Sequence, residues 1–245
     1  MLVQKENKIG EVVAKNFHTA KVFENLGLDF CGGGKKTIGD ACRERGMDPD
    51  FVVSEVSKVQ GSNGTAAHFE SWEADFLADY IINNHHSYVL NTIPTIEHHL
   101  QKVIDAHGHN HPELSKIDEA FTSLKNELLD HMAKEEKMLF PYIKKMNFAY
   151  KNTLEMPVPP FGSVGNPIKV MESEHEAAGS LMAAINKFSG GYTPPADACG
   201  TFKVLYGELK EFETDLHMHI HLENNILFPK ACLLEEKLNK TYSTL

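Results

Sequence analysis

The chain has 245 residues, of which 42% are hydrophobic and 24% charged, so it can bury a sizeable core and wholesale disorder is excluded. The formal net charge of −10 argues against a basic surface that holds nucleic acid. We find neither an apolar N-terminal segment nor a run of about 18 apolar residues, and expect no export signal and no membrane partner. Four cysteines without CxxC pairs then indicate reduced thiols and a cytoplasmic location.

The N-terminal quarter has the pattern of a small helical module. Apolar residues at helical spacing between positions 12 and 26 predict a helix that Gly27 ends. A loop with three consecutive glycines follows at 29–34, and further helices are predicted to begin near Thr37 and at Pro49. The Gly/Ser-rich stretch 61–65 is typical of a linker. We therefore predict an N-terminal domain over 1–62 and a second domain over 66–245.

The second domain shows long helical patterns and no alternating strand pattern. Four helices are predicted near 70–107, 112–147, 164–189 and 195–237, separated by Pro- and Gly-rich breaks. Helices joined by short or moderate loops are typical of an up-down-up-down four-helix bundle. The predicted fold class is therefore all-α.

The positions expected to face the bundle core recur every three or four residues and are mostly apolar. Histidine interrupts this stripe once in the first and once in the third predicted helix, and His-Glu pairs interrupt it in the second and fourth. The residues are His86, His131, Glu135, His175, His219 and Glu223. The remaining stripe of the first helix is expected at Trp72, Phe76, Asp79, Asn83, Leu90 and Ile93, and that of the second is expected to include Met138.

The second and fourth helices share one motif. His131 and Glu135 are followed by Met-Leu-Phe-Pro, and His219 and Glu223 by Ile-Leu-Phe-Pro, at the same spacing. Side chains at i and i+4 lie one turn apart on one helix face, so each pair can offer an imidazole and a carboxylate to neighbouring metal ions.

Six buried polar groups at one level of a bundle require cations, because buried carboxylates without partners cost free energy. Six ligands do not suit one tetrahedral zinc ion. They suit two metal ions, each with two histidines, and with both glutamates as bridges. Iron accepts imidazole and carboxylate ligands, so we predict two iron ions per chain, joined further by an oxo or hydroxo group.

Other histidines are not assigned to this centre. His107, His109 and His111 form a loop that could bind a surface metal, and we expect a solvated turn instead. Only His219 of the alternating 217–221 series is expected to face the core, and surface positions are expected for three others, His85, His98 and His99. Glu127 and Glu174 could support ligands from outside or simply be solvated.

These motifs resemble one family, the RIC (repair of iron centres, ScdA-like) proteins, which join a short N-terminal domain to a hemerythrin-like bundle. The resemblance spans nearly the whole chain. It is carried by the loop Asp-Phe-Cys-Gly-Gly-Gly-Lys at 29–35, by Met-Glu-Ser-Glu-His at 171–175 and by the two His-Glu motifs. It implies the same six iron ligands and marks His107 as recurrent. The family usually has two adjacent cysteines where this chain has Cys31 and Gly32, so thiol chemistry would rest on Cys31.

The resemblance implies a cytoplasmic stress protein that restores iron–sulfur clusters damaged by nitric oxide or oxidants. Its partners would be damaged iron–sulfur proteins, with nitric oxide or oxygen as small ligands; iron donation and enzymatic reduction of nitric oxide both stay open. Cys31 is expected to have a lowered pKa from loop amides and to contact a client or pair two chains in a homodimer. The alternatives are a hemerythrin-like carrier or sensor of oxygen or nitric oxide and a metal-free interaction protein.

Overall fold

The computed structural model describes residues 3–59 and 69–242, and the predicted linker at 61–65 lies outside them. In these described ranges the ordered elements are helices, with one isolated bridge between Lys8 and Thr37. The predicted all-α class is confirmed. No described helix combines the length and the apolar character that a membrane span requires.

Contacts divide the chain into two units, and neither is a continuous segment. The first unit comprises Met1–Ala78, Ile143–Val164 and Met218–Leu245, and the second comprises Asp79–Tyr142 and Gly165–His217. The helices α5 (Ala74–Ile81), α8 (Phe140–Lys151) and α10 (Gly200–Leu222) have residues in both units.

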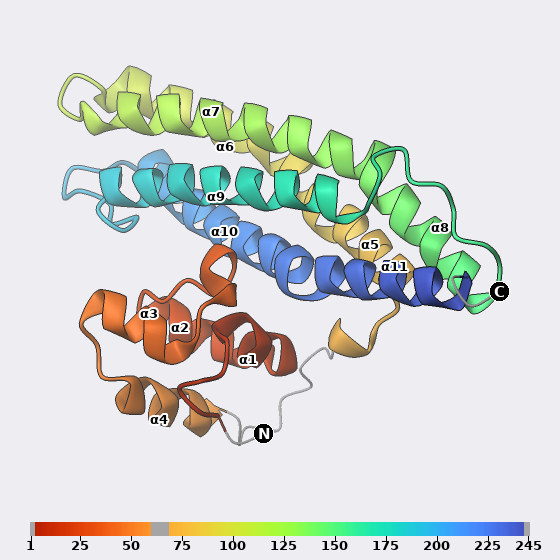
Figure 1. The fold of residues 1–245 in the computed structure, drawn as a ribbon. Helices are drawn as coiled ribbons and strands as arrows, with labels where there is room; N and C mark the ends of the chain where they lie inside the picture. The colour runs from red at the N-terminus through yellow and green to blue at the C-terminus, as the bar shows by residue number, and fades with distance from the viewer. Residues whose placement is uncertain (1–2, 60–68, 243–245) are drawn as a thin grey trace. The chain divides into compact units, whose positions relative to one another are not determined.

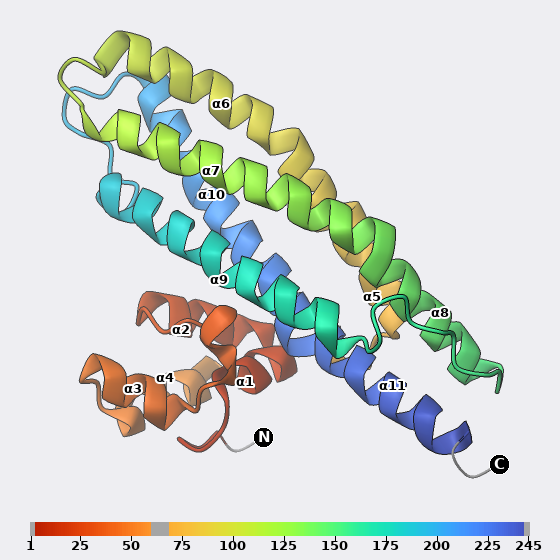
Figure 2. The same ribbon diagram turned by 45° about the horizontal axis from the view of Figure 1, so that its top comes forward.

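The second unit is a four-helix bundle. Its helices are α6 (Ser87–His107), α7 (Glu113–Lys134), α9 (Gly165–Phe188) and most of α10. They lie side by side in Figure 1 and in the turned view of Figure 2, as two hairpins whose loops are at the same end. The inward positions predicted for α7, α9 and α10 are buried; examples with at most 1% exposure are Ile117, Phe121, Met182, Ile185, Leu205 and Phe212.

Three π-helical turns interrupt the long helices. They are η4 (Ile82–His86) and η5 (Glu135–Leu139) in the second unit and η6 (Glu223–Leu227) in the first. A π turn holds one more residue than an α turn, so the buried face moves by one position beyond it.

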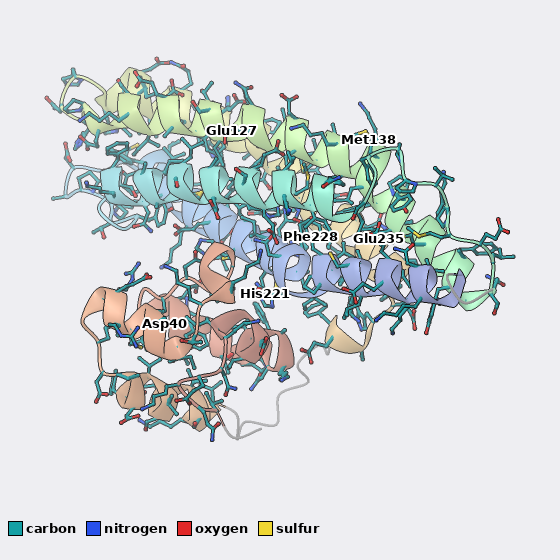
Figure 3. All side chains as sticks on the ribbon, viewed as in Figure 1. Asp40, Glu127, Met138, His221, Phe228 and Glu235 are labelled. Carbon is teal, nitrogen blue, oxygen red and sulfur yellow. The ribbon has the colours of Figure 1, made fainter. Side chains whose placement is uncertain are left out.

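This shift explains where the predicted stripe is wrong. Phe76 is 56% exposed and Met138 is 51% exposed, whereas Leu77 and Leu139 are buried. Asp79 and Asn83 are also exposed. Further along the first long helix Leu90 is exposed and its neighbour Val89 is buried, so the prediction was off by one residue there too. Figure 3 shows Met138 on the outer side of its helix.

The N-terminal part of the first unit contains six short helices. They are α1 (Ile9–Lys15), η1 (Phe17–Thr19), α2 (Ala20–Asn25), η2 (Gly32–Lys35), α3 (Ile38–Arg45) and α4 (Pro49–Val59). The single helix predicted over 12–26 is broken at Asn16, which is extended and whose side chain accepts a bond from His18 N–H. Gly27, with a positive φ of 68°, and the start at Pro49 agree with the prediction.

The rest of the first unit comprises η3 (Phe69–Ser71), the ends of α5 and α8, the end of α10 with η6, and α11 (Phe228–Tyr242). Lys230 on α11 donates to the carbonyls of Glu70 and Trp72, at 2.7 and 2.9 Å. Glu235, labelled in Figure 3, accepts from Ser163 Oγ and from Val164 N–H, at 2.7 and 2.8 Å. These bonds tie α11 to residues 70–72 and to residues 163–164 within the unit.

Within the same unit, the N-terminal helices contact η6 through Asn225. The Asn225 amide donates to the Phe30 carbonyl at 3.0 Å. Gly10 on α1 and Gly34 on η2 pack so closely that an added Cβ would lie 2.2 and 2.7 Å from Asn225 Oδ1. Glycine is therefore required at both positions if the contact is to keep its present spacing.

Candidate metal centre

Four of the six predicted ligands lie together in the second unit. His86 is the last residue of η4, His131 lies in the last turn of α7, Glu135 begins η5, and His175 lies in the middle of α9. Each of these side chains is at most 3% exposed. Two of the four adjoin or lie in π turns, which occur often at functional sites.

Their nitrogen and oxygen atoms converge. Glu135 Oε2 lies 3.4 Å from His86 Nε2 and 3.3 Å from His131 Nε2. His131 Nε2 lies 3.0 Å from His175 Nε2. Ligands bound at about 2.0–2.2 Å to one ion have atoms at comparable separations.

The Glu135 carboxylate provides a test of whether a cation fits. It is fully buried, and neither oxygen has a hydrogen-bond donor among the described residues. A buried carboxylate in that state costs several kcal/mol. A metal ion bound between the carboxylate and the surrounding imidazoles would remove this cost, so the residues present fit a metal centre.

The Nδ1 atoms of two of these histidines lie within hydrogen-bond distance of carboxylates. His86 Nδ1 lies 2.8 Å from Glu136 Oε1, and His131 Nδ1 lies 3.0 Å from Glu174 Oε2. A carboxylate at Nδ1 favours a proton on that atom and so leaves Nε2 as the ligand atom. The sequence analysis did not identify Glu136 in this role, whereas Glu174 was one of the two glutamates considered for it.

Glu174 also forms an ion pair with Lys134. Partial burial alone would raise the pKa of Glu174, but the bonds from Lys134 and His131 lower it below its ordinary value. The carboxylate is therefore charged when it holds His131. Glu127 is exposed on α7, as Figure 3 shows, and its position suggests no such role.

The other two predicted ligands lie together in the first unit. His219 Nε2 is 3.0 Å from Glu223 Oε1, and the side chains are 1% and 0% exposed. Glu223 begins η6 as Glu135 begins η5, so the repeated sequence motif corresponds to a repeated local structure. The chain thus has buried groups of histidine and glutamate that are able to hold metal ions, and they are of the kind that fits a di-iron site.

Two histidines that we did not expect in the interior are buried. His85 is 5% exposed because the extra residue of η4 turns it inward. Its Nδ1 lies 2.9 Å from Asp215 Oδ1. His221 is 1% exposed and packs edge-on against Phe30, with ring centroids 5.7 Å apart. Burial lowers the pKa of His221 to about 4, so it is neutral at physiological pH. Figure 3 labels His221, whose contacts lie with the N-terminal helices of its unit.

Cys31 differs from the sequence-based expectation. The Gly32 amide bonds the thiol and by itself would lower its pKa, whereas Asp29 accepts bonds from Cys31 N–H at 2.8 Å and from Gly33 N–H at 2.7 Å. The side chain is buried, and burial together with the Asp29 charge raises the Cys31 pKa well above its ordinary value. The predicted lowering of this pKa is therefore wrong, because burial and the Asp29 carboxylate outweigh the bond from the Gly32 amide.

The fold and the buried groups define a helical-bundle protein of the metal-binding, hemerythrin-like class. Residues 77–231 match the family model for the hemerythrin HHE cation binding domain, and residues 5–60 match the ScdA_N domain of unknown function. The chain belongs to the family that joins these two domains, in agreement with the resemblance found in the motifs.

Curated relatives are similar to this chain over most of their length. The iron-sulfur cluster repair protein YtfE of Pectobacterium atrosepticum is 33% identical over 233 residues, which cover 94% of this chain and 98% of that protein. The protein of the same name from Yersinia pseudotuberculosis is 33% identical over 212 residues, covering 86% and 90%.

Proposed function

We propose that this protein repairs iron–sulfur clusters damaged by nitric oxide or oxidative stress. The relatives that carry this name match both the N-terminal domain and the bundle, at 33% identity over nearly full length. This favours a repair role over oxygen carriage or sensing, which needs no N-terminal domain. The clients would be damaged iron–sulfur proteins in the cytoplasm, where free cysteines such as the four found here stay reduced.

We further propose that all six buried ligands hold one pair of iron ions. Glu135 and Glu223 would bridge the pair, and the histidines at 86, 131, 175 and 219 would complete it with an oxo or hydroxo group. The single observation that carries this is the fully buried Glu135 carboxylate, which has imidazole nitrogens at 3.3 and 3.4 Å and no hydrogen-bond donor in the described part of the chain. The matched hemerythrin segment, 77–231, includes all six residues.

Iron bound there would supply a redox-active metal that can be given to a client or can bind a diatomic ligand. The protein's own contribution is positional. Glu136 and Glu174 orient two ligating imidazoles through their Nδ1 atoms, at 2.8 and 3.0 Å. The full burial of Glu135 and Glu223 keeps bulk water from the carboxylates, which strengthens their interaction with cations.

The proposal is tested with full-length protein and a [4Fe–4S] hydro-lyase damaged by nitric oxide. Wild-type protein should contain about two irons per chain and restore hydro-lyase activity. His131→Ala should lose iron and repair together, because it removes a ligand from the buried centre. His217→Ala is the matched control: His217 is only partly buried, and its variant should keep both.

The two measurements separate the metal from the repair role. A content of one metal ion, or of zinc, would contradict the di-iron centre. Two irons without any recovery of the hydro-lyase would contradict the repair function while leaving the centre intact.

A further inference from the structure

The second unit has another group of metal-ligating side chains, at the end of the bundle where the α6–α7 turn and the α9–α10 loop lie together (Figures 1 and 2). His107, His111 and Asp197 each place one ligand atom within 4.8 Å of the others. His107 lies 21 residues after His86, which corresponds to ~30 Å along a helix. This group is therefore separate from the proposed iron ligands.

One backbone hydrogen bond brings the two histidines close together. The helix α6 ends at His107, and His111 N–H donates to the His107 carbonyl at 3.0 Å, which closes one turn of the backbone after the helix. The two imidazole ring centroids lie 6.2 Å apart. The centroids of both imidazole rings lie 5.4 Å from the ring centroid of Phe202, which is fully buried.

Two carboxylates lie on opposite sides of the His111 ring. His111 Nδ1 is 2.8 Å from Glu113 Oε1, and Nε2 is 3.2 and 3.1 Å from the two Asp197 oxygens. A neutral imidazole has one N–H and can serve only one of these carboxylates. Its other nitrogen would then direct a lone pair at carboxylate oxygens, which is repulsive unless a cation lies between them. That cation is either a second proton or a metal ion.

The spacing suits a metal ion. Ligands bound at about 2.0–2.2 Å in a tetrahedral site are separated by roughly 3.3–3.5 Å. The Nε2–Oδ distances of 3.1 and 3.2 Å need to widen only slightly to admit an ion. Since the Asp197 side chain is 59% exposed, this movement is open to it, and water can reach the remaining coordination position.

We propose that His107, His111 and Asp197 bind one divalent transition-metal ion of the zinc class. Glu113 would hold the proton of His111 on Nδ1 and leave Nε2 as the ligand, as carboxylates behind metal-bound histidines do. Two imidazoles, one carboxylate and an open position are the donor set of many single-metal sites. The bound ion ties the α6–α7 turn to the loop before α10.

The experiment uses iron-loaded, full-length protein. Co²⁺ is titrated in under anaerobic conditions and followed by its visible absorption, and the bound Co²⁺ is then displaced with Zn²⁺. Iron content is measured before and after the titration, so that exchange at the iron ligands is detected. We expect one Co²⁺ per chain in addition to the iron, fully displaced by one equivalent of Zn²⁺, with the iron retained.

Variants decide whether the three residues bind the ion. His111→Ala and Asp197→Asn should each weaken Co²⁺ binding by at least about tenfold, since each removes a direct ligand. His109→Ala, in the same turn but outside the group, should bind as the wild type does. Asp197→Asn is a change at an exposed loop position, so its fold is not at risk. If no additional Co²⁺ binds, or if Asp197→Asn and His109→Ala bind equally, the cation is a proton and the proposal is wrong.

Discussion

Glu135→Gln should stabilise the metal-free protein and reduce the stabilisation that iron provides. The substitution keeps the shape of the side chain and removes its charge, in a position that is fully buried and 3.3–3.4 Å from the Nε2 atoms of His86 and His131. In metal-free protein, neither oxygen of the wild-type carboxylate has a hydrogen-bond donor within residues 3–59 and 69–242. A glutamine can donate its amide to an imidazole nitrogen, so the metal-free variant should be more stable by about 1–3 kcal/mol.

Iron should stabilise the variant less than it stabilises the wild type. A ligand that binds only the folded state stabilises it by RT ln(1 + [L]/Kd), so a 100-fold loss of affinity removes ~2.7 kcal/mol. For a protein of this size each kcal/mol corresponds to roughly 2–4 °C in melting temperature. The rise in melting temperature on iron loading should therefore be about 5–11 °C smaller for the variant than for the wild type.

The assay is thermal unfolding of four samples, wild type and variant, each iron-loaded and stripped by chelator. Glu127→Gln is the control, because it makes the same chemical change at an exposed position of α7 and should be neutral in both states. If Glu135→Gln lowers the melting temperature equally in loaded and stripped protein, Glu135 acts through packing and the metal assignment loses its main support.

Two further predictions concern the first unit. Because burial and Asp29 raise the Cys31 pKa, alkylation of Cys31 at pH 7–8 should be much slower than alkylation of the exposed Cys199. The Cys31 rate should rise about tenfold per pH unit, since the thiolate is the reactive form. Mass spectrometry of iodoacetamide-treated protein measures both rates, and equal rates would contradict the burial argument. Gly10→Ala would place a Cβ 2.2 Å from Asn225 Oδ1 and should lower the stability of the fold by about 1–3 kcal/mol. Hydrogen exchange in α1 should become faster while the iron content stays the same. Unchanged exchange would show that the contact adjusts without a loss of stability.

The sequence alone was sufficient to predict the all-α class and to place the six candidate ligands in the core, where they are buried; their binding of iron stays a prediction. Helical periodicity depends on local spacing, so a polar residue in an apolar stripe is visible without coordinates. His175 on α9 and His219 on α10 were found in this way, and both are buried. The start of α4 at Pro49 and the end of α2 before Gly27 could also be predicted, because helix ends depend on a few adjacent residues.

Only the tertiary structure decided the features that depend on distant residues or on a change of helical period. The π turns moved Phe76 and Met138 to the surface, since one inserted residue shifts the buried face and leaves no mark in the apolar pattern. The pairing of His111 with Asp197 joins positions 86 residues apart, which no local spacing could indicate. The raised Cys31 pKa likewise follows from how the chain packs, because burial removes the water that would stabilise a thiolate.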